Sequence, residues 1–356
     1  MHTQKRIPVA VLGATGMVGQ RFIELLQDHP WFELVALAAS DQHEGRPYAQ
    51  VAQWRLSGSE MPTSAASLPV VSCSPIALPR DVKIAFSALP AEVAGDIEAA
   101  FAQAGIAVFS NAKNYRMQDD VPLLIPEVNA DHALALIEQR KKRGWKGSIV
   151  TNANCSATPL VLALKPLQEA FGVRKVLVTT LQAISGAGYP GIPSYDILDN
   201  AIPFISGEEE KVESETRKML GTWQEGLGFT DASMVVSAQC NRVATREGHL
   251  ECVSVELQSD TSPEGIIAAW QNYTSVSQSL KLPSAPEQAL IYRSEPNRPQ
   301  TLLDREAGHG MSVTIGRLRP CPILSYKFVL LGHNTIRGAA GGSILNAELC
   351  VSKGLI

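Results

Sequence analysis

The sequence predicts an α/β protein: an N-terminal Rossmann-like domain with a doubly wound parallel sheet, followed by an α+β domain with a mixed sheet. Three observations support this fold class. The chain has 356 residues, more than a single hydrophobic core usually holds. Short apolar strand patterns alternate with helix patterns as far as Asn152, the rhythm of a parallel sheet. Longer strand patterns, less evenly interleaved with helices, follow.

The first domain begins with a strand, a glycine-rich turn and a helix. Residues 7–12 form a short apolar run, 13–19 contain three glycines, and an amphipathic pattern follows before a second strand at 33–38. The later expected elements are strands at 82–87, 106–110 and 148–151 and a helix at 91–103. The Ser-, Pro- and Gly-rich region 42–74 predicts loops with short edge strands.

The second domain is expected to contain four long strands and a terminal helix. The strands are predicted at 173–184, 234–243, 249–257 and 323–331. The segment 335–353 has a helix pattern, for which Asn334 is the expected N-cap. Small residues at 337–342 would let this segment approach another element or a ligand closely.

Composition excludes several classes of protein. The net charge is −4, and the short basic run 140–143 ends a helix pattern, where it complements the helix dipole; we expect no nucleic-acid partner. No apolar run is long enough to span a bilayer, and the N-terminus leads directly into a strand pattern, so we expect a cytoplasmic protein without a signal peptide. Six cysteines lack metal-ligand spacing, so reduced thiols and no metal site are predicted.

The glycine-rich turn predicts dinucleotide binding. Gly13, Gly16 and Gly19 follow a strand and open a helix with the spacing G-x-x-G-x-x-G. Such glycines permit a tight turn, approach to a pyrophosphate and close helix packing. The alternative is a purely structural turn. Thr15 and Met17 should line the loop.

The end of the second strand indicates which cofactor is used. An acidic residue there usually binds a ribose 2′-hydroxyl. Here Ser40 can donate to a phosphate, whereas Asp41 would oppose one if it pointed inward. Local chemistry therefore favours NADP, with a solvated Asp41 as the plain alternative.

Cys155 is the candidate nucleophile, because it lies where a strand pattern passes into a helix pattern. The positive end of the helix dipole would favour its thiolate near neutral pH. A small cysteine that merely packs under the helix start is the alternative.

Three further polar positions are candidates for binding or proton transfer. Gln182 ends a strand beside a glycine-rich loop, where it would bind a substrate or cap the loop backbone. Arg242 and His249 flank a polar turn, and a hairpin register would place them opposite one another. The charged run from Glu208 to Arg217 reads as solvent-facing ion pairs in the absence of other observations.

Seven segments together resemble the aspartate-β-semialdehyde dehydrogenases of the branch found in archaea, fungi and some bacteria. They are 13–19 (GATGMVG), 110–117 (SNAKNYRM), 152–156 (NANCS), Gln182 with 185–188 (SGAG), Glu208 with Lys211, Arg242 with His249, and 334–340 (NTIRGAA). They extend over nearly the whole chain, and their common order and spacing make the resemblance specific.

The resemblance implies a role for each segment. It makes Cys155 the nucleophile, His249 the general acid/base and Gln182 the group that orients the acyl carbon. The implied substrate-binding residues are Arg242 and Glu208 at the substrate carboxylate, Arg116, Lys211 and Lys113 at phosphate, and Asn154. The implied cofactor-binding residues are Gly13, Thr15, Gly16, Met17, Val18, Ser40, Ser87, Ser185, Gly186, Gly188, Asn334 and Thr335.

It also implies NADP as cofactor, a homodimer or homotetramer, and two domains. Residues 1–154 would bind NADP, completed by a C-terminal helix at 335–356, and residues 155–334 would carry catalysis and dimerisation.

The implied reaction is the reductive dephosphorylation of 4-phospho-L-aspartate to L-aspartate 4-semialdehyde, in the pathway to lysine, methionine, threonine and isoleucine. The Cys155 thiolate would form a thioester, and hydride from NADPH would reduce it. Backbone N–H groups at the helix start after Cys155 are expected to stabilise the oxyanion.

Other functions stay open. Malonyl-CoA reductases and N-acetyl-glutamyl-phosphate reductases share the general plan of this fold. A coenzyme A ester offers no inorganic phosphate to Arg116 and Lys211, so the presence of both residues favours an acyl phosphate. A catalytically silent NADP-binding regulator is the alternative of another class. The intact set of Cys155, Gln182, Arg242 and His249 argues against it.

Overall fold

The N-terminal lobe is built on a seven-stranded sheet whose strand pairs are all parallel in the described part of the chain, residues 5–356 of this computed structural model. Its strand order is β3-β2-β1-β4-β5-β7-β6. The strands are β1 (Ile7–Leu12), β2 (Phe32–Ala39), β3 (Val70–Ser72), β4 (Ile84–Ser87), β5 (Ala107–Ser110), β6 (Leu123–Leu124) and β7 (Ser148–Asn152). The predicted doubly wound fold is confirmed, and its strand order reverses between β1 and β4, where such sheets bind ligands.

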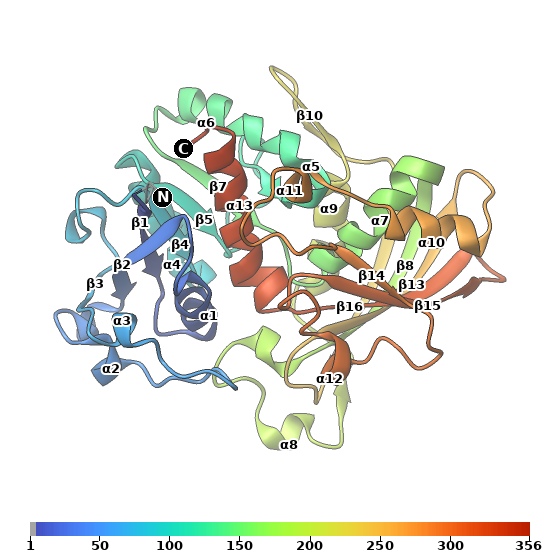
Figure 1. Cartoon of the computed structure of the whole chain (residues 1–356), viewed down its shortest axis with the longest axis horizontal. Helices are drawn as coiled ribbons and strands as arrows, with labels where there is room; N and C mark the ends of the chain where they lie inside the picture. The colour runs from blue at the N-terminus through green and yellow to red at the C-terminus, as the bar shows by residue number, and fades with distance from the viewer. Residues whose placement is uncertain (1–4) are drawn as a thin grey trace.

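Helices cover both faces of this sheet (Figure 1). Alternate residues of β1 point to opposite faces, so Val9 and Val11 pack with α1 (Met17–Leu26) and α13 (Gly341–Ser352). Ala10 and Leu12 pack on the other side with α4. The remaining longer helices of this lobe are α4 (Ala91–Gln103) and α6 (Ala135–Arg143), and the basic run is the last turn of α6, as predicted.

The second lobe contains a mixed sheet, also as predicted. Its order is β14-β15-β16-β13-β8-β12-β9. The strands are β8 (Val173–Gln182), β9 (Ala201–Ile202), β12 (Val235–Val243), β13 (His249–Leu257), β14 (Leu290–Arg293), β15 (Val313–Pro320) and β16 (Tyr326–Gly332). Strand β12 runs parallel to β8, whereas β13 runs antiparallel to it.

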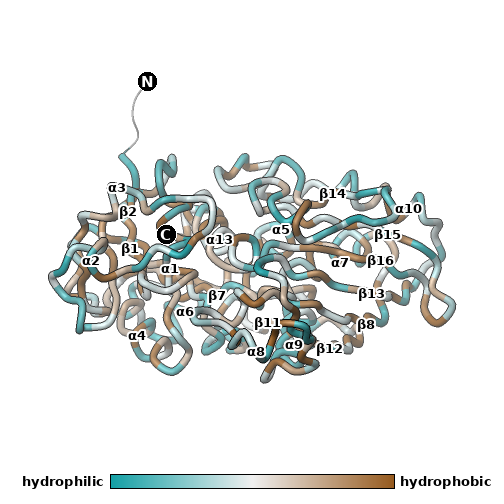
Figure 2. Tube along the Cα trace, turned by 90° about the horizontal axis from the view of Figure 1, so that it is seen from below, coloured by the Kyte–Doolittle hydropathy of each residue, from teal (hydrophilic) through white to brown (hydrophobic). Residues whose placement is uncertain are grey.

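Among residues 5–356, helices pack on one face of the second sheet only. Figure 2 shows α7 as an apolar segment inside this lobe, and its buried leucines contact the inward side chains of the sheet. The covering helices are α7 (Ala157–Phe171), α9 (Glu208–Met219) and α10 (Pro263–Gln271). The opposite face carries Leu177 and Val235, which are 46% and 61% exposed.

Short elements complete the chain. They are β10 (Thr222–Gln224), β11 (Gly228–Thr230), α2 (Tyr48–Val51), α3 (Thr63–Ala66), α5 (Pro126–Asn129), α8 (Ser194–Ile197), α11 (Val276–Ser279) and α12 (Thr301–Asp304). The region 42–74 thus contains two short helices that the sequence did not predict. Within residues 5–356, no helix is long and apolar enough to cross a membrane. All six cysteines are free thiols.

The predicted hairpin between Arg242 and His249 is wrong, because β8 lies between β12 and β13. In the parallel pair Arg242 is opposite Gln182, and in the antiparallel pair Leu250 is opposite Leu181. The polar turn therefore passes over the end of β8. Arg242 and His249 still reach the same edge of the sheet, with Gln182 between them.

The predicted N-cap at Asn334 is also wrong. Its Oδ1 accepts a hydrogen bond from the Gly248 backbone N–H, and its Nδ2 donates to Ser185 Oγ, both at 2.8 Å. The helical segment starts two residues later as the π-helix η5 (Ile336–Ala340). Asn334 therefore joins two loops of the second lobe instead of capping a helix.

The C-terminal segment connects the two lobes, and α13, drawn in red in Figure 1, stands between them. The Arg337 guanidinium donates to both oxygens of Glu127 at 2.6 and 2.7 Å, with both side chains almost fully buried. A Cβ added to Gly338 would lie 2.7 Å from Cys155 Cβ. The small residues here thus allow the close approach that the sequence predicted.

We expect Arg337→Met to lower the free energy of unfolding by about 3–5 kcal/mol, because it leaves the buried Glu127 carboxylate unpaired. Chemical denaturation monitored by circular dichroism checks this value. The control is Glu169→Ala, which removes an ion pair to Lys165 in which Glu169 is 56% exposed and should cost less than about 0.5 kcal/mol. Equal effects of the two substitutions would contradict a structural role for the buried pair.

Candidate active site

A cleft of about 750 Å³ opens between the two lobes and collects most of the residues predicted from the sequence. It lies at the carboxyl ends of the parallel strands, where ligands bind in doubly wound folds. The predicted residues that line it are Val18, Lys113, Arg116, Asn154, Cys155, Ser185, Gly186, Gly188, Glu208, Lys211, Arg242, Asn334 and Thr335. Gln182 and His249 are buried directly behind this lining.

Cys155 and His249 are in direct contact. Sγ of Cys155, in the turn between β7 and α7, lies 3.2 Å from Nε2 of His249, the first residue of β13. The other ring nitrogen, Nδ1, accepts a hydrogen bond from the Ala183 backbone N–H at 3.1 Å. A thiol and an oriented histidine are therefore held together at the cleft.

Asn154 caps the helix that follows Cys155. Its Oδ1 accepts hydrogen bonds from the backbone N–H groups of Ser156 and Ala157 at 2.8 and 3.1 Å. These are the groups that the sequence analysis expected to stabilise an oxyanion. That expectation is wrong for these two groups, because Asn154 already occupies them.

Burial sets the protonation of the Cys155–His249 pair. Burial, followed by the negative charge of Glu208, raises the pKa of Cys155 to about 12. Burial, followed by the positive charge of Arg242, lowers the pKa of His249 to about 3. Desolvation thus opposes the Cys155 thiolate that the helix dipole was expected to favour.

Glu208 is a buried part of the site, so the solvent-facing interpretation is wrong for it. Its carboxylate accepts hydrogen bonds from Asn154 Nδ2 at 2.8 Å, Lys211 Nζ at 3.0 Å and Gln182 Nε2 at 3.2 Å. Burial opposes its ionisation, but Asn154 and Lys211 lower the pKa of Glu208 below its usual value. Glu208 therefore remains charged and connects α9 to the turn that carries Asn154 and Cys155.

Glu215 is a site residue that the sequence analysis missed. Its two oxygens accept from Arg116 Nη1 at 2.9 Å and from the Asn154 backbone N–H at 2.6 Å. One turn further, Lys218 donates to three backbone carbonyls of the loop that carries Arg116. The spacing of Glu208, Glu215 and Lys218 at i, i+7 and i+10 places them on one helix face. This spacing is the signal that would have identified Glu215 and Lys218 as buried residues of the site.

Gln182 and Arg242 are held by neighbours on the same sheet edge. The Gln182 amide donates to Thr180 Oγ1 and Glu208 Oε1, at 3.3 and 3.2 Å. It therefore does not cap the adjacent loop, which was one of the two interpretations of its position. Arg242 Nη1 donates to the Ala183 carbonyl at 2.7 Å, which fixes the guanidinium at the wall of the cleft.

The glycine-rich turn fits a dinucleotide. Gly13 has a φ of +74°, and a Cβ there would lie 2.7 Å from the Ala88 carbonyl oxygen, so only glycine is accommodated. After Gly16, α1 begins without a capping side chain from residues 5–356 and without an acidic residue in its first turn. Its free N–H groups therefore suit a pyrophosphate. Met17 lines an adjoining pocket with Ser185 and Gly188.

Besides Gly13, Gly16 and Met17, three further predicted cofactor residues lie outside the cleft lining. Thr15 is in the glycine-rich turn, where its carbonyl accepts from Gln20 Nε2 at 3.2 Å. Ser87 is fully buried and donates to Glu98 at 2.6 Å. Ser40 is exposed at the end of β2, beside an equally exposed Asp41. The structure thus places the glycine-rich turn beside the cleft and leaves the side chains of Thr15, Ser40 and Ser87 outside the cleft lining.

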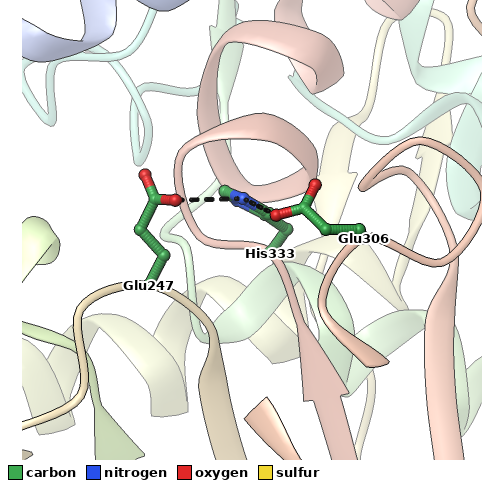
Figure 3. A group of neighbouring side chains, drawn as sticks. All are labelled: Glu247, Glu306 and His333. Carbon is green, nitrogen blue, oxygen red and sulfur yellow. Dashed lines mark ion pairs between the residues drawn. The ribbon is translucent and has the colours of Figure 1, made fainter. Parts of the chain in front are cut away.

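A cluster of three titratable side chains, Glu247, Glu306 and His333, lies behind the cleft (Figure 3). His333 Nε2 is 3.6 Å from a Glu247 oxygen and 3.5 Å from a Glu306 oxygen, a spacing that a cation would also suit. His333 Nδ1 lies 3.3 Å from the Ile336 backbone nitrogen, which orients the ring with Nε2 toward the two carboxylates. The group is therefore an ion-paired cluster.

This cluster joins the two lobes. Glu247 also accepts from Arg21 of α1 at 3.0 Å. Burial opposes both charges, but His333, Arg21 and Arg305 lower the pKa of Glu247 to about 2, and the two carboxylates raise the pKa of His333. The turn that carries His249 is thereby attached to the nucleotide-binding helix.

The fold and the site together define the class of protein: the chain belongs to the semialdehyde dehydrogenase family. Residues 8–136 match the model of the semialdehyde dehydrogenase NAD binding domain, and residues 164–337 match the model of the dimerisation domain.

Its relatives include aspartate-semialdehyde dehydrogenases of archaea and fungi. The Archaeoglobus fulgidus protein is 51% identical over 352 residues, which cover 99% of this chain and 100% of the relative. The Schizosaccharomyces pombe protein is 48% identical and covers 98% of this chain and 99% of its own length. The crystal structure of the Candida albicans protein with NADP superposes with a TM-score of 0.89, at 43% identity, over 99% of this chain and 100% of that one.

We expect Glu215→Ala to lower the free energy of unfolding by about 3–5 kcal/mol, because it leaves the buried Arg116 guanidinium and the Asn154 N–H without their acceptor. Glu215→Gln should cost less, since its amide oxygen still accepts a hydrogen bond. Urea denaturation measures both, and Glu210→Ala, at an exposed position of the same helix, is the matched control. A neutral Glu215→Ala would rule out this anchoring role.

Proposed function

We propose that this chain catalyses the reaction named for its relatives: the NADP-dependent reductive dephosphorylation of 4-phospho-L-aspartate to L-aspartate 4-semialdehyde, and its reverse. The observation that carries the proposal is the 3.2 Å contact between Cys155 and His249 at the wall of a cleft that also exposes Arg116, Lys211 and Arg242. The reaction belongs to the cytoplasmic pathway to lysine, methionine, threonine and isoleucine.

Each charged group in the cleft matches a part of the substrate. Arg242 suits the α-carboxylate, since a guanidinium binds carboxylates through paired donors. Arg116 and Lys211, with Lys113 at the rim, suit the phosphate. Glu208 anchors Lys211 at 3.0 Å and supplies an acceptor for the substrate ammonium group. Gln182 and Asn154, both bonded to Glu208, border the position of the acyl group.

The proposed cofactor site is the glycine-rich turn together with the facing loops of the second lobe. Gly13, Gly16 and the first turn of α1 would hold the pyrophosphate. The neighbouring contacts would come from Thr15, Met17, Val18, Ser40, Ser87, Ser185, Gly186, Gly188, Asn334 and Thr335. Bound NADPH supplies the hydride. The chain's own residues position the acyl group on Cys155 and exclude water from it.

The proposed domain boundaries follow from the proposed positions of the cofactor and the substrate. Residues 1–154 with the C-terminal helix 335–356 would form the NADP-binding unit. Residues 155–334 would form the catalytic and dimerisation unit.

A steady-state assay tests the function: the protein should form NADPH from L-aspartate 4-semialdehyde and NADP⁺ only when inorganic phosphate is present. Cys155→Ala should reduce turnover by at least about 10⁴-fold and leave NADP binding, measured by calorimetry, largely unchanged. Turnover by Cys155→Ala would exclude the thioester route. NADPH oxidation that depends on malonyl-CoA and not on the phosphorylated substrate would indicate the coenzyme A reductase instead, and cofactor binding without any turnover would indicate the silent regulator.

We also propose that the chain forms a homodimer, or a homotetramer made of two such dimers, through the open face of the second sheet. That face exposes Leu177 on β8, an interior strand of the sheet, and apolar side chains there favour burial against a second copy. Sedimentation equilibrium should give a dimer or tetramer mass, and Leu177→Arg should shift it to the monomer. A monomeric unmodified protein would refute the proposal.

A further inference from the structure

We propose that Lys218 is a positioning residue of the phosphate site: its buried ammonium group holds the backbone of the loop 113–121, which presents Arg116 to the cleft. The inference rests on the proposed function, in which Arg116 and Lys211 bind phosphate. It goes beyond that function, because Lys218 lies outside the cleft lining and would act through Arg116. Three observations support it: a repeated motif in α9, the contacts of the ammonium group, and the contacts of Arg116.

The first observation is the repeated motif. Glu208-x-x-Lys211 recurs seven residues later as Glu215-x-x-Lys218. Seven residues are close to two helical turns, so both pairs lie on one face of α9. The first pair reaches the cleft, where Lys211 donates to Glu208 at 3.0 Å. The second pair is directed at the loop 113–121. The second motif therefore binds the protein's own loop instead of a ligand.

The second observation is the way in which the Lys218 ammonium group is bound. Its Nζ donates to the backbone carbonyls of Arg116, Gln118 and Val121 at 2.7, 2.9 and 3.1 Å. The side chain is almost fully buried, and the Phe229 ring, centred 4.4 Å from Nζ, adds a cation–π contact. An ammonium group has three N–H donors, one for each carbonyl. The contacts thus match the charged form of Lys218 and fix three points of one loop.

The third observation is that Arg116 is held at both ends. Lys218 binds its carbonyl, while its guanidinium donates to Glu215 at 2.9 Å and to the Asn111 carbonyl at 2.8 Å. Arg116 nevertheless lines the cleft. A guanidinium binds phosphate through paired, aligned N–H groups, so a shift of the loop backbone would misalign them. A displacement of about 1 Å in such a group can cost roughly 10²-fold in rate.

The effect should be confined to one part of the substrate. Arg242, which we propose for the α-carboxylate, lies at the end of β12 and is fixed by the Ala183 carbonyl. Asn154 is fixed by Glu208 and Glu215. These contacts do not involve Lys218. Loss of its ammonium group should therefore weaken the binding of phosphate and leave the binding of L-aspartate 4-semialdehyde unchanged.

The charge of Lys218 also gives the phosphate site a pH dependence. A neutral amine has only two N–H donors for the three carbonyls, so the loop is held less firmly once Lys218 loses a proton. Burial lowers the pKa of Lys218 to about 8, although nearby carboxylates oppose this shift. The charged or titratable groups around it are Asp119, Asp120 with its partner Arg143, Glu215, Asp231, Arg116 and His132. Burial lowers the pKa of His132 to about 4, so His132 stays neutral where Lys218 titrates. The affinity for phosphate should fall as the pH rises through about 8.

Lys218→Met removes the ammonium group and keeps an unbranched side chain. In the oxidation of L-aspartate 4-semialdehyde, we expect KM for phosphate to rise about 10–10²-fold, while kcat and KM for the aldehyde change less than about threefold. The control is Lys141→Met, the same exchange at an exposed position of α6, which should behave like the unmodified protein. Equal increases in both KM values, or an unchanged KM for phosphate, would overturn the proposal.

The pH profile decides the question even if Lys218→Met does not fold. In the unmodified protein, KM for phosphate should rise about tenfold between about pH 7 and pH 9.5, as Lys218 loses its proton. Lys218→Arg, whose guanidinium stays charged over this range, should lack this rise. A flat profile in the unmodified protein, or the same rise in Lys218→Arg, would show that the charge of Lys218 does not control phosphate binding.

Hydrogen exchange supplies a readout that needs no turnover. The backbone amides of residues 113–121 should exchange faster in Lys218→Met than in Lys141→Met, and faster in the unmodified protein at high pH than the intrinsic rate increase explains. Unchanged protection of this loop would refute the role of Lys218. The absence of phosphate-dependent turnover in the unmodified protein would refute the proposed function instead, and hydrogen exchange would still decide whether Lys218 holds the loop.

Discussion

The buried carboxylates of α9 are the constraint on which the site depends. A charge removed from water must be paired, and Glu208 and Glu215 each share their charge between a cation and Asn154. Asn154 is therefore held at its side-chain amide and at its backbone N–H. Because its Oδ1 caps α7, the turn that presents Cys155 has little freedom. One helix of the second lobe thus sets the geometry of a turn that begins in the first.

The sheet of the second lobe places the partners of that turn. Strands β12 and β13 lie on either side of β8, one parallel and one antiparallel to it. The last residues of β12 and β8 and the first of β13 therefore meet at one edge, which brings Arg242, Gln182 and His249 into a row. The loops beyond this edge face the carboxyl ends of the first sheet, so Cys155, the charged side chains and Val18 at the start of α1 line one cleft.

The sequence predicted those parts of the fold and the site that residues close together in the chain determine. The strand at Ile7–Leu12, the glycine-rich turn and the helix after it are encoded within one stretch of chain, and the fold class followed from them. Pairing between distant strands is not encoded locally: neighbours in sequence usually pair, which is why a hairpin was expected where β8 intervenes. Glu215 was missed because a charged helix normally faces water. Asn334 resembled an N-cap, but its partners lie in loops far away in the sequence.

The position of the C-terminal segment has a consequence for how the molecule is made. Ile344 and Leu345 of α13 cover the same sheet face as Val9 and Val11, and Gly338 forms the wall against Cys155. During synthesis the first sheet therefore keeps one face partly uncovered until residues 336–352 have been made. Cys155 acquires its complete set of neighbours only then. A nascent chain without this segment lacks part of its first core and part of the wall around Cys155. The last step of folding and the completion of the candidate active site therefore coincide.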